Sequence, residues 1–341
     1  MTSVKYLRTA LFAVVAMVVG AFAANVAVAQ TKITLAVPNP SAITWTPLWV
    51  AIGQGYFKDE GLDVTVEAVD GSSQVLQAMA AEQAELGFPG PGPVLAARAR
   101  GVDVVFLYNV YPKSVFGLMV REESSYQGPA GLKGKTIGVG TADGAEVAFT
   151  RAILSDLGMK EGTDYTFLPV GDGGIAAAAF LRGDIEAYAA AVSDAAIMRS
   201  KGLALREITP EPYLAYFGNG LAALRSYMEK NPKVIEGFGR ALVRGMKFAS
   251  DPANENAVLE NAAAGNPQEG EDRKFAAALL ASTVERMTPT DTYMSKGFGY
   301  LPPEHWKIWH ENLVSSGDLK KPLDDLEAAY SNKFVDLWNA R

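Results

Sequence analysis

Residues 62–101 read LDVTVEAVDGSSQVLQAMAAEQAELGFPGPGPVLAARARG, and this stretch decides the fold. A strand-like run at 62–69 meets an Asp-Gly turn and then a helix that begins at a pair of serines. A second short strand, at 85–88, breaks into the Pro-Gly run 89–93, and the next helix closes at Gly101. Each loop ends at a helix N-terminus, so free backbone N–H groups point beyond the edge of the predicted sheet.

The same pattern recurs later in the chain. Residues 170–202, VGDGGIAAAAFLRGDIEAYAAAVSDAAIMRSKG, align with residues 69–101 without a gap. Identical pairs in this alignment are Val69 and Val170, Ala78 and Ala179, Glu85 and Glu186, Arg98 and Arg199, and Gly101 and Gly202. Chance supplies some identities among abundant alanines and glycines, but it does not readily explain the shared order of strand, turn and helix. The sequence therefore predicts two similar α/β lobes that present helix starts to a shared cleft.

Residues 1–29 have the pattern of a secretory signal peptide. A basic start precedes an apolar run at 11–23 and a small-residue cleavage site at 27–29. We therefore expect cleavage before Gln30 and a mature protein in the periplasm. The alternative, a membrane anchor, is disfavoured because the apolar run is short for a bilayer-spanning helix.

The composition argues against several classes of function. The chain has no cysteine and a net charge of −7, which disfavours thiolate metal sites, Cys nucleophiles and nucleic-acid partners. His305 and His310 are five apart on a predicted helix, so they cannot share a metal from one face. The chain contains neither a nucleophile elbow nor a Gly-Lys-Ser/Thr phosphate motif. We therefore predict no metal, no cofactor and no catalytic residue.

The rest of the chain adds strands first and helices later. Continuous apolar runs at 104–108 and 115–120 are typical of buried parallel strands. Helical patterns dominate after Ser226, and the predicted helices are 234–248, 253–264, 273–284, 305–314 and 326–338. In the fourth of these, Trp306, Trp309 and Leu313 share one face, which favours core packing over ligand binding.

Four motifs together carry a family resemblance. They are PLWVAIGQGYFKDEGLDV at 47–64, GSSQ at 71–74, AEQAELG at 81–87 and LKGKTIGV at 132–139. In this order they resemble the substrate-binding proteins of bacterial ABC importers for nitrate, sulfonates, taurine and thiamine-precursor pyrimidines. The resemblance covers nearly all of the chain beyond the signal peptide. The Pro-Gly run at 89–93 departs from the family pattern and should stiffen a ligand-contacting loop.

The resemblance implies a type II periplasmic-binding-protein fold of class α/β, with two doubly wound α/β lobes joined by two crossings. Lobe 1 would hold residues 30–113 plus 225–341, and lobe 2 would hold 120–215. The crossings would lie near 111–117 and 216–221. In such proteins the lobes close over the bound molecule.

The implied function is delivery of a small-molecule ligand to the permease and ATPase subunits of an ABC importer at the inner membrane. The protein would act as a monomer and perform no chemistry. One alternative is an enzyme on the same fold, such as a pyrimidine-precursor synthase. The resembling synthases rely on a Cys-rich segment, which this chain lacks. Another alternative is a ligand receptor for a membrane sensor.

The candidate ligand-binding residues lie in loops predicted to face the cleft and in the crossings. They are Ser41, Trp45, Ser72, Ser73, Pro89, Gly90, Pro91, Tyr111, Thr141, Asp143, Gly144, Ala145, Asp172, Ser193, Asp194 and Asn219. Serines and acids at helix starts are also natural caps, so capping competes with ligand contact at these positions. For Asp194 the two interpretations are evenly balanced. Trp45 fits stacking on a flat ligand as well as it fits core packing.

The charges of the predicted cleft loops indicate the ligand class. These loops contain acids, including Asp143, Glu146, Asp172 and Asp194, but no Lys or Arg, and Lys113 is the one nearby cation. A buried carboxylate needs a donor or a positive group, whereas an oxyanion ligand usually meets Arg or Lys. We therefore expect a flat, neutral or zwitterionic organic molecule with N–H or ammonium donors, such as an aminopyrimidine.

Overall fold

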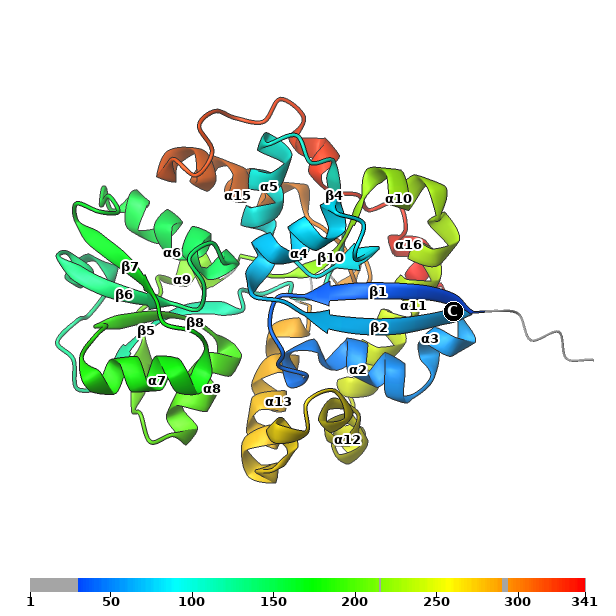
Figure 1. Ribbon diagram of the computed structural model, residues 1–341, viewed down its shortest axis with the longest axis horizontal. Helices are drawn as coiled ribbons and strands as arrows, with labels where there is room; N and C mark the ends of the chain where they lie inside the picture. The colour runs from blue at the N-terminus through cyan, green and yellow to red at the C-terminus, as the bar shows by residue number, and fades with distance from the viewer. Residues whose placement is uncertain (1–29, 215, 290–293, 341) are drawn as a thin grey trace, which may run out of the picture. The chain divides into compact units, whose positions relative to one another are not determined.

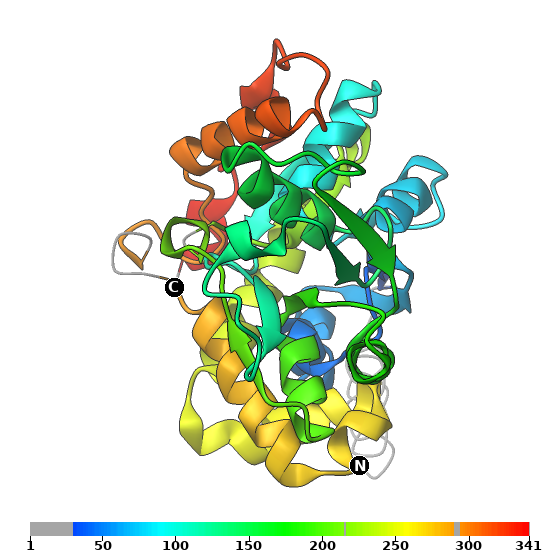
Figure 2. The ribbon, with the colours of Figure 1, turned by 90° about the vertical axis from the view of Figure 1, so that its left-hand side faces the viewer.

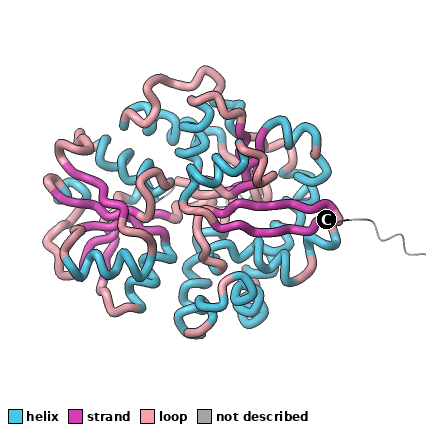
Figure 3. The backbone as a smooth tube through the Cα atoms, viewed as in Figure 1, coloured by secondary structure: helices cyan, strands magenta, loops and turns pink. Residues whose placement is uncertain are grey.

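The computed structural model describes residues 30–214, 216–289 and 294–340. The predicted signal peptide, residues 1–29, lies outside the described residues. Two separate five-stranded sheets form the centre of the structure (Figure 1; Figure 3). We call the lobe built on the first sheet lobe 1 and the lobe built on the second sheet lobe 2. The prediction of a two-lobed α/β fold is confirmed.

The first sheet has the strand order β2-β1-β3-β10-β4. Its strands are β1 (Thr31–Val37), β2 (Leu62–Ala68), β3 (Leu86–Gly87), β4 (Val104–Asn109) and β10 (Gly220–Leu224). The second sheet has the order β7-β6-β8-β5-β9. Its strands are β5 (Phe116–Arg121), β6 (Lys135–Val139), β7 (Tyr165–Pro169), β8 (Ala187–Ala191) and β9 (Leu205–Glu207).

Helices cover both sheets and continue to the end of the chain. The α-helices up to the return crossing are α2 (Thr46–Gly53), α3 (Tyr56–Asp59), α4 (Gly71–Ala80), α5 (Pro91–Ala99), α6 (Ala145–Asp156), α7 (Gly173–Arg182), α8 (Val192–Ser200) and α9 (Glu211–Leu214). Those after it are α10 (Arg225–Lys230), α11 (Pro232–Ala249), α12 (Glu255–Gly265), α13 (Arg273–Met287), α15 (Pro303–Ser316) and α16 (Val335–Asn339). Short 3-10 turns are η1 (Ile43–Trp45), η2 (Pro129–Leu132), η3 (Pro252–Asn254), η4 (Pro267–Gly270) and η5 (Leu326–Ala329).

The internal repeat corresponds to the same elements in each lobe. The order β2, α4, β3, α5 in lobe 1 is matched by β7, α7, β8, α8 in lobe 2. Gly101 and Gly202, which the alignment pairs, follow α5 and α8 with φ of 90° and 88°. Both helices therefore end at a left-handed residue, a conformation that glycine adopts without a steric cost.

Two strands do not pair as predicted. The apolar runs at 104–108 and 115–120 do form β4 and β5, but β4 pairs with β10 in antiparallel fashion, and β5 is antiparallel to β8 and β9. The chain crosses between lobes just after β4 and returns just before β10, which reverses the local direction. These runs are continuously apolar because every residue of β4, and all but the last of β5, is buried.

The last predicted helix, 326–338, is also wrong. The structure has only the turn η5 and the short helix α16 there, with an extended segment between them. In that segment Tyr330 forms a parallel bridge with Phe106, and Ser331 N–H donates to the Phe106 carbonyl at 3.0 Å. The segment therefore pairs with backbone hydrogen-bonding groups on the outer edge of β4 instead of continuing as a helix. The other four C-terminal helices are confirmed with small shifts of their ends.

Helix α6 joins the two lobes in one hydrophobic core. Phe149 and Ile153 of α6 are buried in the same cluster as Trp309 and Leu313 of α15. Beyond this apolar contact, Ser155 Oγ donates to the Ser315 carbonyl at 3.2 Å. Figures 1 and 2 show α15 near the top of the molecule and α13 near the bottom. The lobes are therefore held together on the α15 side by an apolar seam.

The strands of the first sheet come from residues 31–109 and 220–224, and those of the second come from residues 116–207. The stretches between these ranges are compatible with crossings near 111–117 and 216–221. We propose the lobe boundaries given above on this basis. Among the described residues, no helix is both long and apolar enough to cross a bilayer.

Candidate ligand-binding cavity

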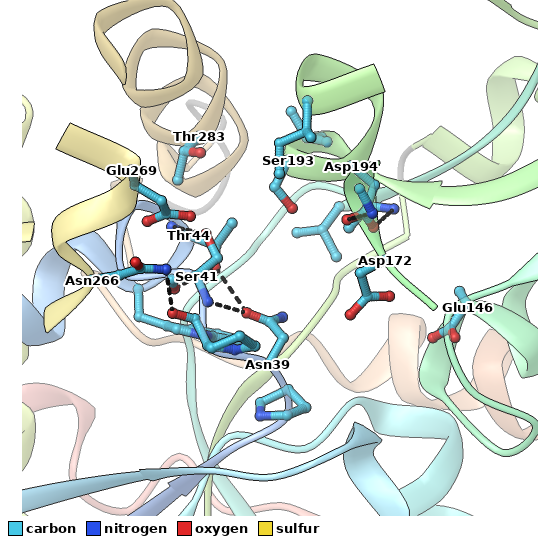
Figure 4. Close-up of a pocket in the computed structure, with 18 of the residues that line it drawn as sticks. Asn39, Ser41, Thr44, Glu146, Asp172, Ser193, Asp194, Asn266, Glu269 and Thr283 are labelled. Carbon is cyan, nitrogen blue, oxygen red and sulfur yellow. Dashed lines mark hydrogen bonds between the residues drawn. The ribbon is translucent and has the colours of Figure 1, made fainter. Parts of the chain in front are cut away.

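A cavity of about 580 Å³ lies between the two lobes. Figure 4 shows its two walls: Asn39, Ser41, Thr44 and Glu269 on one side, and Glu146, Asp172, Ser193 and Asp194 on the other. The first wall follows β1, η1 and η4, while the second follows the starts of α6, α7 and α8. A volume of this size suits a small organic molecule.

Ten of the sixteen candidate residues line this cavity. They are Ser41, Trp45, Ser72, Tyr111, Thr141, Ala145, Asp172, Ser193, Asp194 and Asn219. The repeat brings most of them together, because equivalent loops of the two lobes meet at the same gap. Their roles in ligand binding remain predictions.

The other six candidates do not line the cavity. They are Ser73, Pro89, Gly90, Pro91, Asp143 and Gly144. Ser73 Oγ donates to the Asp143 carbonyl at 3.3 Å, so this pair joins the lobes at the rim. Gly90 faces the other lobe directly, since a Cβ there would lie 2.4 Å from Ala145 Cβ. Ser73, Asp143 and Gly90 therefore serve the contact between lobes, which the sequence does not distinguish from a contact with ligand.

The sequence analysis missed the part of the wall that comes from the C-terminal helices. Asn266, Gln268, Glu269, Glu271, Asp272, Phe275 and Thr283 all line the cavity, together with Asn39 and Thr44 of lobe 1. The C-terminal group belongs to η4 and α13, which follow the strands by many residues. No local motif marks these positions, because only the folded arrangement brings them to the cleft.

Glu269 fixes the backbone of lobe 1 at the cavity. Its Oε2 accepts hydrogen bonds from the backbone N–H groups of Ala42 at 2.8 Å and Ile43 at 2.9 Å. These are the N–H groups at the start of η1, which have no acceptor within the turn. Asn266 adds a bond from its side-chain amide to the Pro40 carbonyl at 3.2 Å. The loop that carries Ser41 is therefore positioned by a distant segment of the chain.

Trp45 serves both the core and the cavity wall. It is 3% exposed, and its ring centroid lies 5.2 Å from that of Phe88 and 6.0 Å from that of Tyr111. The Tyr111 hydroxyl donates to the Thr44 carbonyl, which fixes the tyrosine ring. Among the described residues the Trp45 indole N–H has no acceptor. The aromatic cluster gives this wall a rigid, partly apolar surface.

Asp194 is a helix cap in this structure. Its Oδ1 accepts the Gly173 N–H at 3.2 Å, and its Oδ2 accepts the Ala191 N–H at 3.1 Å. It thereby provides acceptors for backbone N–H groups at the starts of both α7 and α8. Burial raises the pKa of Asp194 well above its usual range, and the neighbouring Asp172 raises it further. The capping interpretation is therefore correct for this residue.

Asp172 and Glu146 lie on either side of Gly140. A Cβ at Gly140 would be 2.2 Å from Asp172 Oδ1 and 3.3 Å from Glu146 Oε1, so the two carboxylates are near neighbours. Burial raises the pKa of Glu146 to about 7; backbone donors such as the Thr141 N–H partly oppose this, and Asp172 adds to it. Burial also raises the pKa of Asp172, although the Tyr188 hydroxyl opposes this shift.

The raised pKa of Glu146 predicts a pH dependence of stability. The pKa of Glu146 is about 7 in the folded protein, and its ordinary value is 4.5. Between these two pH values the folded protein therefore keeps a proton that the unfolded chain has released. Stability from this group is complete below pH 4.5 and is lost as the pH rises towards 7. Chemical unfolding should show that the free energy of unfolding falls less between pH 5 and pH 8 in Glu146→Gln than in the unchanged protein. Equal losses would contradict the shift.

The cation near the cavity is Lys201 and not Lys113. Lys201, at the end of α8, is a lining residue, and its Cε would lie 3.9 Å from a Cβ at Gly174. The Lys113 ammonium instead donates to the Glu285 carbonyl at 3.1 Å, outside the cavity. The predicted cleft loop ended at Asp194, so the far end of α8 was left out. Within the described residues, no cluster of three or more His, Asp or Glu side chains is placed to hold a metal ion.

The two lobes and the cavity between them define a periplasmic-binding-protein fold. The family model described as NMT1/THI5 like matches residues 42–255, which is more than half of the chain. The protein belongs to the NMT1/THI5-like family. The predicted resemblance is therefore confirmed at the level of the family.

Three relatives with assigned names match the chain at low identity. The riboflavin-binding protein RibY of Chloroflexus aurantiacus is 24% identical, over 89% of this chain and 86% of its own length. The formylaminopyrimidine-binding protein of Halalkalibacterium halodurans is 25% identical, over 65% of this chain and 68% of its own. The Saccharomyces cerevisiae 4-amino-5-hydroxymethyl-2-methylpyrimidine phosphate synthase THI11 is 24% identical, over 85% of this chain and 89% of its own.

Two solved structures show the same fold. A Bordetella bronchiseptica RB50 protein superposes with a TM-score of 0.76 at 23% identity, covering 91% of this chain and 97% of its own. The alkanesulfonate-binding protein SsuA of Xanthomonas axonopodis pv. citri, bound to MOPS, has a TM-score of 0.69 at 18% identity, covering 89% of this chain and 99% of its own. At these identities the likeness extends to the fold and not to the ligand.

Proposed function

We propose that this protein is an extracytoplasmic solute-binding protein that delivers a small organic molecule to the permease and ATPase of an ABC importer. The observation that carries the proposal is the cavity between the lobes, whose polar groups come from both sides of the cleft. A ligand that contacts both walls favours the closed arrangement of the lobes, and closure is the signal such a receptor presents to its transporter. The family supports this proposal.

The ligand we propose is a flat, neutral or zwitterionic organic molecule with N–H or ammonium donors, and not a bare oxyanion. Helix starts are the natural sites for oxyanions, because their backbone N–H groups lack acceptors. Here Asp194 and Glu269 already accept such N–H groups on the cavity wall, and Glu146 accepts the Thr141 N–H of the loop before α6. The protein's own carboxylates thus stand where a sulfonate or nitrate would bind. The names of the riboflavin- and formylaminopyrimidine-binding relatives support a flat heterocycle.

An enzyme on the same fold is the second candidate function, because the yeast relatives are named as synthases. The absence of cysteine in this chain weighs against a mechanism that depends on thiols. The two candidates differ in the fate of the ligand. A binding protein returns its ligand unchanged after prolonged incubation, whereas a synthase converts it. Mass spectrometry of the released molecule separates them.

A thermal-shift panel tests the proposed ligand class. The panel contains nitrate, taurine, alkanesulfonates, aromatic carboxylates and pyrimidines. We expect a pyrimidine or a related flat heterocycle to raise the melting temperature, because binding to the folded state alone adds stability in proportion to the logarithm of ligand concentration over Kd. Nitrate and simple sulfonates should leave it unchanged. Tight binding of nitrate or a simple sulfonate would contradict the proposal.

A further inference from the structure

We propose that Asp172 is the specificity-determining contact of the cavity and that it pairs with a flat, positively charged N–H donor group on the ligand. Amidinium, guanidinium and protonated aminopyrimidine groups share this chemistry. The inference rests on the proposed function, because it specifies the charge of the ligand that the cavity would receive. It places the principal contact on Asp172 and not on Asp194, for which capping and ligand contact were evenly balanced in the sequence.

Among the described residues, Asp172 is the carboxylate of the lobe 2 cavity wall that accepts no backbone N–H group. Both oxygens of Asp194 accept backbone N–H groups, and Glu146 Oε1 accepts the Thr141 N–H at 3.2 Å. Asp172 receives only a long contact of 3.5 Å from the Tyr188 hydroxyl, whose single proton has a shorter partner in the Gly171 carbonyl at 3.0 Å. Figure 4 shows the Asp172 carboxylate directed into the space between the walls. It is therefore placed to accept hydrogen bonds from a ligand.

The charges around Asp172 favour a cation. Glu146 approaches it across Gly140, Asp194 is its neighbour at the start of α7, and Asp70 of lobe 1 adds a further negative charge. Among the described residues no Lys or Arg forms an ion pair with Asp172, Glu146 or Asp194. Lys201 of α8 also lines the cavity, but it forms no ion pair with these acids, so their carboxylates repel one another. A ligand cation between them relieves this repulsion, whereas an anion increases it.

Two side chains beyond the acidic residues leave an acceptor oxygen free for a ligand with donors. Ser193 is 4% exposed, its hydroxyl has no partner in the described part of the chain, and Figure 4 shows it directed into the cavity. Asn219 is equally buried, and its amide nitrogen donates to the Phe88 carbonyl at 3.0 Å, so the amide oxygen is left without a donor among the described residues. Buried polar groups are normally paired. Here a bound molecule would complete the pairing.

A series of three probes with the same shape tests the charge. Benzamidine, benzamide and benzoate present a cation, a neutral group and an anion on the same flat ring. We expect calorimetry to show benzamidine binding at least about tenfold more tightly than benzamide, because hydrogen bonds to a charged group are the stronger ones. Benzoate should not bind measurably at about 10 mM.

Two variants assign the preference to Asp172. Asp172→Asn keeps the shape of the side chain and removes its charge, so the preference for benzamidine over benzamide should disappear. Asp172→Ser keeps a residue suited to the start of α7 and should give the same result if the asparagine variant folds poorly. The matched control is Asp63→Asn, which removes a carboxylate from an exposed position on β2. The control should keep the full preference.

Three outcomes would overturn the inference: benzoate binding as tightly as benzamidine, a preference that survives in Asp172→Asn, or no binding by any of the three probes. Failure here is distinguishable from failure of the proposed function. If the thermal-shift panel yields a neutral organic ligand while the probes fail, the receptor function stands and the cation preference is wrong. If neither experiment yields an organic ligand, the proposed function fails as well.

Discussion

Replacing Gly90 with valine should weaken binding of the tightest panel ligand about a hundredfold while both lobes remain folded. Gly90 has φ −80° and ψ 161°, which any residue adopts, so the substitution places no strain on lobe 1 itself. A Cβ there would lie 2.4 Å from Ala145 Cβ, at the first residue of α6 in lobe 2. The added side chain therefore acts as a wedge between the lobes. Overpacking of this kind costs about 1–3 kcal/mol, and each 1.4 kcal/mol is a factor of about ten in affinity.

Calorimetry measures the loss, and small-angle scattering checks its cause. The unchanged protein should become more compact when ligand is added, while Gly90→Val should keep the larger radius of gyration at the same ligand concentration. Gly128→Val is the matched control, because Gly128 is extended at φ −172° and a Cβ there meets nothing within 4 Å. Normal affinity and normal compaction in Gly90→Val would show that the Gly90 contact does not control closure.

Replacing Glu269 with alanine should lower the free energy of unfolding by about 2–4 kcal/mol. The backbone N–H groups of Ala42 and Ile43, which are both 1% exposed in the intact protein, would lose their acceptor. Each buried donor left without a partner costs about 1–3 kcal/mol. The loop with Ser41 and Thr44 would also lose its position at the cavity, so ligand affinity should fall together with stability.

Glu269→Gln makes this prediction specific. Both N–H groups donate to the same carboxylate oxygen, Oε2, so the single oxygen of a glutamine amide can accept both. We expect Glu269→Gln to keep most of the stability in a urea titration. Glu260→Ala, which removes an exposed carboxylate from α12, should change little. A glutamine variant as unstable as the alanine variant would mean that charge, and not the acceptor, is what matters at this position.

The fold was predictable from the sequence because its signals are local. The strand, turn and helix pattern of residues 62–101 recurs in residues 170–202, and each copy became part of one lobe. The glycines that close the two copies share the same left-handed backbone conformation. Local patterns of this kind do not depend on distant partners, so they can be read from one sequence.

The errors arose where distant parts of the chain meet. Tyr330 is extended and not helical, because its segment pairs with the backbone at the free edge of β4. The antiparallel direction of β10 follows from the return crossing. The apolar residues of β10 do not indicate this direction. Pairings between segments far apart in sequence decide such features, and a single sequence does not display them.

The candidate site divides in the same way. Residues at strand ends, such as Asp172 and Ser193, were found because the repeat marks the loops that face the cleft. Glu269 was missed because η4 reaches the cavity only through the packing of the C-terminal helices. The capping role of Asp194 and the unused acceptor capacity of Asp172 depend on hydrogen bonds that form only in the folded protein.

The most direct test of the proposed function is a crystal structure of the protein with the most stabilising molecule from the thermal-shift panel. We expect that molecule, chemically unchanged, in the cavity between the lobes, with Trp45 on one side and Asp172 on the other. A molecule bound elsewhere on the surface would contradict the account. So would a chemically converted product in the cavity, since the protein would then be an enzyme and not a receptor.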